Sequence, residues 1–78
     1  MTLNPNGKAH RMLARLAEGD GTLGDLRRAA SDHRRAFHVV KAVVDRGLAA
    51  SNQGNYFITQ RGHEALRQLR AGVAVGDA

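Results

Sequence analysis

The segment at 34–46, with the sequence RRAFHVVKAVVDR, constrains the fold most, because its apolar residues recur with the period of a helix and a Gly-Leu pair closes it. At about 100° per residue, Ala36, Val40 and Val43 share one face, which predicts a helix with one buried side. Phe37 lies at the margin of that face. The opposite side and its edge hold Arg34, Arg35, His38, Lys41 and Asp45. We therefore expect a helix with a buried back and a largely cationic front.

Two helices are expected before this segment. The Asn-Pro-Asn sequence at 4–6 favours a helix start, because Asn caps free backbone amides and Pro is tolerated in the first turn. The helix at 8–18 then places its apolar side chains on one face: Ala9, Met12, Leu13, Leu16 and Ala17. Glycines at 19 and 21 end it. A short extended piece at 22–23 precedes a second helix at 25–30, and we expect Ser31 or Asp32 to cap the third helix.

The pattern changes after Gly47. Two short apolar runs at 48–51 and 56–59 predict strands, and the residues at 52–55, which tolerate turn conformations, predict that they form a hairpin. Thr59 can cap a last helix at 60–70, whose Ala65, Leu66 and Leu69 would face inward. Residues 72–78 have little to bury, so we predict a disordered tail after a single domain at 5–71.

Charge and composition limit the classes of partner that this 78-residue chain is expected to bind. Twelve Lys and Arg oppose seven Asp and Glu, giving a formal charge of +5, and the excess concentrates in residues 27–41. Such a basic surface favours a polyanionic partner. Without cysteine, neither disulfides nor thiolate zinc sites can form. No apolar run approaches the roughly 18 residues that span a bilayer, and no leader pattern is present, so we expect a soluble cytoplasmic protein and no membrane partner.

The order of these elements resembles the winged helix-turn-helix fold. The residues that carry the resemblance are Leu26, Val40, Val43, the Asp-Arg-Gly-Leu corner at 45–48, the Tyr-Phe-Ile-Thr run at 56–59, Gly62 and Leu66. This pattern is similar to that of small bacterial and phage regulators, including the MarR-like group, without the long helices through which MarR-like proteins dimerise. The fold class implied is mainly α with a small β-hairpin: a three-helix core, a two-stranded wing and a C-terminal helix.

The resemblance implies sequence-specific binding of duplex DNA, by a transcriptional regulator or similar site-recognising factor of a bacterium or phage. Its third helix would enter the major groove, so the positions that match are Arg34, Arg35, His38 and Lys41. The matching wing-tip residues are Asn52, Gln53 and Asn55, which are neutral where relatives commonly carry Arg or Lys. On the second helix, Arg27 and Arg28 are candidates for phosphate contacts. We expect Asp45 to lie outside the contact or to pair with Lys41.

Other interpretations of the same residues stay open. Charged helix faces are commonly only solvated, and His38 can equally hold a structural hydrogen bond. A rival function is a protein-interaction module that uses Phe37, Val44 and the exposed side of the hairpin. RNA binding has less support, because the aromatic residues do not alternate with basic ones. A homodimer could form through the C-terminal helix around Leu66 and Leu69 or through the Met12 face.

The sequence contains no motif typical of an enzyme active site or of a metal site. The histidines at 10, 33, 38 and 63 lack an i, i+4 pair on one helix and have no carboxylate in a ligand motif, so we expect no metal site. The sequence also lacks a nucleophile elbow, a phosphate-binding glycine loop and paired carboxylates in a recognisable context. We therefore expect neither an enzyme nor a cofactor.

Overall fold

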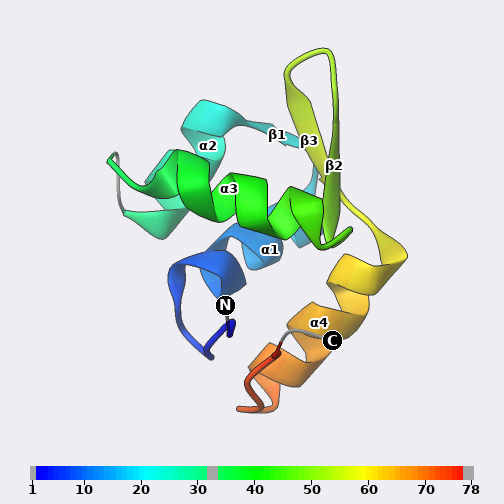
Figure 1. Cartoon of the computed structure of the whole chain (residues 1–78). Helices are drawn as coiled ribbons and strands as arrows, with labels where there is room; N and C mark the ends of the chain where they lie inside the picture. The colour runs from blue at the N-terminus through cyan, green and yellow to red at the C-terminus, as the bar shows by residue number, and fades with distance from the viewer. Residues whose placement is uncertain (1, 32–33, 77–78) are drawn as a thin grey trace.

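The computed structural model describes residues 2–31 and 34–76. Over these residues the chain is mainly helical, with four helices and a small antiparallel sheet of three strands (Figure 1). The elements in chain order are α1 (Lys8–Glu18), β1 (Gly21–Thr22), α2 (Leu23–Ala30), α3 (Ala36–Asp45), β2 (Ala49–Asn52), β3 (Asn55–Ile58) and α4 (Gln60–Arg70). None of these helices has the length and apolar character needed to cross a bilayer.

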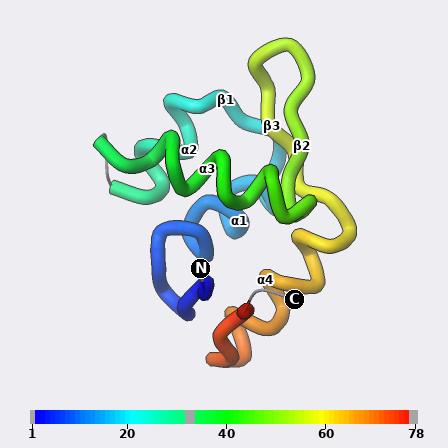
Figure 2. Tube along the Cα trace, in the orientation of Figure 1, coloured from blue at the N-terminus to red at the C-terminus, as the bar shows by residue number. Residues whose placement is uncertain are grey.

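The core forms around α1, which packs against α2, α3 and α4. The trace in Figure 2 shows α3 running across the molecule from near the end of α2 to the hairpin, with α4 beyond its C-terminal end. The largest fully buried side chains are Met12, Leu13, Leu26, Leu66 and Leu69. Met12, Leu66 and Leu69, around which a homodimer contact was suggested, are buried within the single chain.

The helices α1 and α4 have the bounds that the periodicity predicts, but the capping of α1 differs. Gly7 is its N-cap residue and no side chain caps it. Asn6 instead adopts a left-handed conformation, with φ of 63°, and its backbone N–H donates to Nδ1 of His10 at 2.8 Å. The prediction that Asn caps α1 is therefore wrong, because the local turn points the Asn6 backbone toward a side chain one turn into the helix.

The second helix begins two residues earlier than predicted, because Thr22 and Asp25 form a capping box. The Thr22 hydroxyl accepts from the backbone N–H of Asp25, and the Asp25 carboxylate accepts from the backbone N–H of Thr22 at 2.9 Å. Ser31, expected to cap α3, instead ends α2 in a left-handed conformation with φ of 55°. The other expected cap, Asp32, lies outside the described residues. The N-cap residue of α3 is Arg35, which makes no side-chain cap.

The predicted hairpin is present, with a tighter turn and an added strand. Residues Asn52 and Asn55 pair with each other, so only Gln53 and Gly54 form the turn, and both have positive φ. This is the backbone that two-residue hairpin turns require. The short strand β1 pairs with β3 on its other side, giving the sheet order β1-β3-β2. The predicted two-stranded sheet thus has three strands, because the extended piece before α2 reaches β3.

The hairpin is fixed to α4 at a close contact. The Thr59 hydroxyl donates to the carbonyl oxygen of Gly47 at 2.5 Å and accepts from the backbone N–H of Gly62 at 3.1 Å. At Gly62 a side chain would have no room, since an added Cβ would lie 1.9 Å from the carbonyl oxygen of Leu48. The helix α4 and the residue before β2 can approach this closely only with glycine at position 62.

The two ends of the domain also meet. Leu3 and Val75 exchange two backbone hydrogen bonds, of 2.8 and 2.9 Å, in an isolated antiparallel bridge. Leu3 is 2% exposed and belongs to the core, while Val75 packs against it. The packed unit therefore extends beyond the predicted 5–71. In the predicted tail, the described residues 72–76 return to the domain, because Val75 finds both a backbone partner and an apolar surface.

Candidate nucleic-acid interface

The two sides of α3 differ as the periodicity predicts. Ala36, Val40 and Val43 on the inner face are at most 3% exposed. On the outer face the exposed polar residues are His38, Lys41 and Asp45. The inner face packs on α1 and α2, so the outer face is directed away from the core.

Arg34 and Arg35 lie before α3 rather than within it. Both are exposed, and the helix begins only at Ala36. The periodicity of the sequence predicts them within the helix, because arginine has a high helix propensity and nothing local marks the true start. Their place is at the N-terminal end of α3, where the helix has unpaired backbone N–H groups and a partial positive charge.

The last turn of α2 adds two further arginines. Arg28 is exposed and its guanidinium donates to the Asp25 carboxylate at 2.5 Å. Arg27 is half-buried, and its buried Nε has no hydrogen-bond partner within the part of the chain that the structure describes. We use the name basic cluster for the four arginines of this turn and the start of α3: Arg27, Arg28, Arg34 and Arg35.

The acid nearest to the basic cluster along α2 is held in its charged form. Asp25 has a pKa below its ordinary value, chiefly because the backbone N–H of Thr22 donates to its carboxylate, and also because Arg28 binds it. Arg15 lies 3.7 Å from the same carboxylate. Asp25 thus makes its contacts at the N-terminal end of α2. Arg28 is one of its partners, so part of the hydrogen-bonding capacity of Arg28 is already used.

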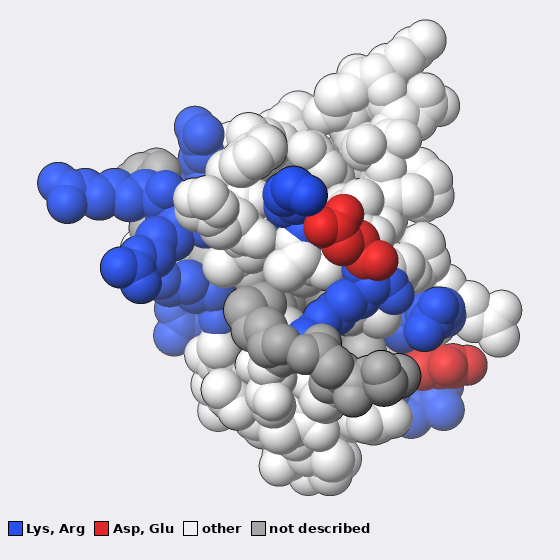
Figure 3. Space-filling view, viewed as in Figure 1, with Lys and Arg blue, Asp and Glu red and all other residues white. Residues whose placement is uncertain are grey.

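The space-filling view shows where the charges gather (Figure 3). Lys and Arg side chains collect over the side of the molecule where α2 ends and α3 begins, while the Asp and Glu side chains visible in this view lie away from it. Farther along α3, Lys41 and Asp45 form the predicted ion pair at 3.2 Å, and their side chains are 63% and 62% exposed. Because this pair is locally neutral, the positive charge of the α3 front is strongest at its N-terminal half.

The hairpin tip carries the three predicted polar residues. Asn52, Gln53 and Asn55 are all exposed, and the hairpin projects beyond the helices (Figure 1). Their side chains have amide groups and no charge, so they can donate and accept hydrogen bonds but add nothing to the positive field. The tip and the basic cluster lie at opposite ends of α3.

An apolar hollow between α3 and the hairpin was missed by the sequence analysis. It has a volume of about 200 Å³ and its lining consists of Phe37, Val40, Lys41, Val44, Ser51 and Tyr56. Phe37, at its rim, is 52% exposed. The margin position of Phe37 was visible in the periodicity, but the hollow depends on the register that pairs Ser51 with Tyr56.

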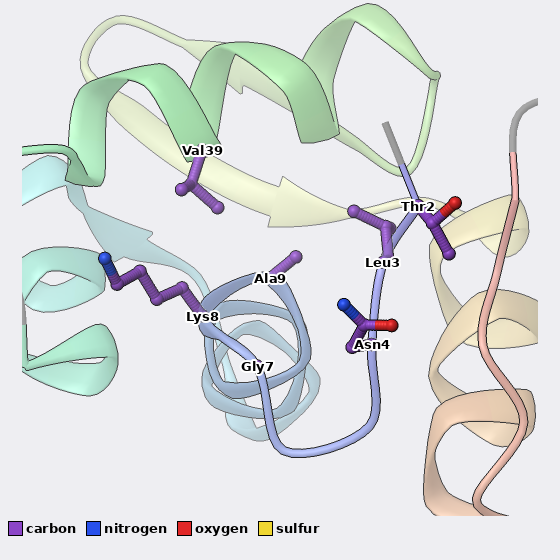
Figure 4. A pocket seen from close by; sticks show the side chains of 7 residues that line it. All are labelled: Thr2, Leu3, Asn4, Gly7, Lys8, Ala9 and Val39. Carbon is purple, nitrogen blue, oxygen red and sulfur yellow. The ribbon is translucent and has the colours of Figure 1, made fainter.

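A second, smaller hollow lies on the other flank of α3. Its volume is about 140 Å³, and Val39 of α3 faces the N-terminal segment and the start of α1 across it (Figure 4). The remaining lining residues are Thr2, Leu3, Asn4, Gly7, Lys8 and Ala9. This lining mixes the polar side chains of Thr2, Asn4 and Lys8 with apolar ones, and we assign no ligand to it.

Metal ligands do not converge in residues 2–31 and 34–76. No group of three or more His, Asp or Glu side chains there is arranged to hold an ion. His10 accepts a backbone hydrogen bond, and His38 stacks edge-on against Phe37 with 6.3 Å between the ring centroids. His33 lies outside the described residues.

Comparison of the chain with protein-family models, curated proteins and solved structures finds no match.

Proposed function

We propose that this protein is a winged helix-turn-helix protein that binds duplex DNA, as a transcriptional regulator or similar site-recognising factor of a bacterium or phage. The observation that carries the proposal is the basic cluster at the N-terminal end of α3, next to an exposed helix face. The order of the elements supports it, since α3 follows α2 after a short stretch of sequence and a hairpin follows α3. In such folds the second helix of the pair lies in the major groove, with its N-terminal residues nearest the bases.

The basic cluster has the chemistry for phosphate and base contacts. Each guanidinium offers a paired donor fork to a phosphate or to guanine, and the start of α3 adds backbone N–H groups and a partial positive charge. In this proposal Arg34 and Arg35 contact the duplex directly, and Arg28 of α2 contacts the DNA backbone. His38 and Lys41 follow along the groove-facing side of α3.

The Lys41–Asp45 ion pair restricts how far along α3 DNA can bind, but it does not prevent binding. Both side chains are exposed, and exposed pairs of this spacing contribute only about 0.3–0.5 kcal/mol. A phosphate can therefore replace Asp45 as the partner of Lys41 at small cost. Because Asp45 itself repels phosphate, we place the C-terminal end of α3 at the edge of the interface.

Salt-dependent binding tests this proposal. With four to six phosphates neutralised per chain, log K for a mixed-sequence duplex falls with log salt at a slope of about −4 to −5. The double change Arg34→Ala with Arg35→Ala should weaken binding and flatten the slope by about 2. A matched control, Arg67→Ala with Arg70→Ala, removes the same charge from exposed positions of α4 and should change the slope less.

A flat salt series, or equal effects of the two double variants, would contradict the proposal. Retention of a duplex at low salt that is abolished by Lys41→Glu would support it. Thermal unfolding of each variant serves as the folding check, because all of these side chains are exposed and their removal should leave the melting temperature nearly unchanged.

The second candidate is a protein-interaction module, which the apolar hollow beside α3 favours. Phe37 and Val44 would then carry the contact, and the basic cluster would serve an acidic partner or only solubility. Absence of any duplex binding at low salt would favour this candidate over the first.

A further inference from the structure

We propose that Phe37 recognises thymine, by packing its ring against the 5-methyl group in the major groove, so that the preferred site has an A·T pair opposite the first turn of α3. This inference rests on the proposed function and adds a sequence preference to it. Thymine is the only base of DNA that presents a methyl group in that groove, and apolar side chains contact it there.

Phe37 is exposed although its chemistry favours burial. It is the second residue of α3 and 52% exposed, and the other large exposed apolar residues within residues 2–31 and 34–76, Phe57 and Val73, lie on other segments. An aromatic ring retained at the N-terminal end of a basic helix surface is expected to have a partner. Its position in the first turn is the one from which side chains reach base edges.

The surroundings of Phe37 leave space for a small apolar group. Phe37, Lys41 and Val44 follow one another at i, i+4 and i+7 on the flank of α3 that faces the hairpin. The hollow that they line with Ser51 and Tyr56 measures about 200 Å³, which is below the roughly 300–1,000 Å³ of small-molecule sites. It is large enough for a methyl group and the edge of a pyrimidine.

The neighbouring His38 supplies the polar half of the contact. Its ring meets that of Phe37 at 70°, with 6.3 Å between centroids, an edge-to-face arrangement that limits the movement of both rings. Thymine presents its O4 acceptor beside the methyl group. An imidazole N–H next to an apolar ring therefore matches the two adjacent features of this base.

Charge favours DNA over an apolar protein segment as the occupant. Lys41 is among the residues that line the hollow, and the basic cluster stands before Phe37 at the start of the same helix. The chain carries a formal charge of +5. A polyanion that also presents a methyl group satisfies both features of this surface.

Deoxyuridine substitution tests the inference, because it removes the thymine methyl and keeps every hydrogen-bonding group. A binding duplex is first selected from a random pool, and each thymine in it is then replaced singly by deoxyuridine. We expect one position at which the wild-type protein loses about fourfold in affinity, the equivalent of burying one methyl-sized group. Phe37→Ala should bind the thymine duplex more weakly and no longer distinguish it from the deoxyuridine duplex.

Two further variants complete the test. Phe57→Ala removes a ring from the hairpin and should keep the fourfold discrimination, whereas Phe37→Leu should keep part of it. Discrimination that survives in Phe37→Ala, or binding indifferent to deoxyuridine at every position, overturns the inference while the proposed function stands. Failure to bind any duplex at low salt overturns both, and then the hollow belongs to a protein partner.

Discussion

Replacing Gly62 with alanine tests how closely α4 is held against the start of the hairpin. An added Cβ would lie 1.9 Å from the carbonyl oxygen of Leu48 and 2.7 Å from Cγ1 of Ile58. Leu48 and α4 would have to separate by about 1 Å before the first contact reached 3.0 Å. The oxygen cannot move alone, because it accepts from the backbone N–H of Thr59 at 3.1 Å.

The expected loss in the free energy of unfolding follows from the side chains that α4 buries. Its Ala65, Leu66 and Leu69 are at most 4% exposed, so a shift of the first turn also loosens the core. Overpacking of this kind costs about 1–3 kcal/mol or more, and alanine returns at most about 1 kcal/mol of helix propensity. We expect the free energy of unfolding to fall by about 2 kcal/mol, which lowers the melting temperature by about 8–16 °C in a domain of this size.

A second glycine in the first turn of a helix provides the matched control. At Gly24 an added Cβ would meet, among the described residues, the Thr22 hydroxyl alone, at an ordinary contact distance of 3.7 Å, so Gly24→Ala should be neutral or stabilising by about 0.5 kcal/mol. Thermal unfolding of both variants, followed by helical circular dichroism, makes the comparison. Equal melting temperatures for Gly62→Ala and the wild-type protein would refute the close contact between α4 and the hairpin.

Three further changes have defined outcomes. Thr59→Val keeps the side-chain volume but removes two hydrogen bonds, so it should lower the free energy of unfolding by about 1–2 kcal/mol in urea titration, and Thr59→Ser should restore most of it. The backbone N–H of Thr22 lowers the pKa of Asp25, so this carboxylate stabilises the fold fully above about pH 4 and loses its effect as the pH falls through its folded-state pKa. Asp25→Asn should therefore be more destabilising at pH 7 than at low pH, and equal destabilisation at both would contradict this assignment. Asp45→Asn should release Lys41 and strengthen duplex binding several-fold with little change in melting temperature, and unchanged affinity would place the end of α3 outside the interface.

Helix positions and their inner faces could be predicted from the sequence because both depend on local patterns. One-sided apolar spacing gave α1 and α4 their observed bounds, and it identified Ala36, Val40 and Val43 as the buried side of α3. The pairing of Lys41 with Asp45 was also predicted, since residues four apart on a helix are neighbours whatever the rest of the chain does.

The start of α3 could not be predicted in the same way. Arginine is compatible with both a helix and the residues before it, so periodicity alone started the helix at Arg34, two residues before α3 begins at Ala36. In the structure α2 ends at Ala30, its C-cap residue Ser31 has a left-handed conformation, and α3 begins only at Ala36. This places the two arginines at the helix end, where the proposed interface has its highest positive charge.

The sequence by itself determined which segments become helices, where a hairpin forms and which side of each helix is apolar, because hydrophobic spacing and turn residues act over a few positions. Only the tertiary structure decided what lies across from those faces. It brought β1 to β3, Val75 to Leu3, and the hairpin to the flank of α3 beside Phe37. Such contacts join residues far apart in the chain, and their geometry depends on how all the buried faces fit together at once.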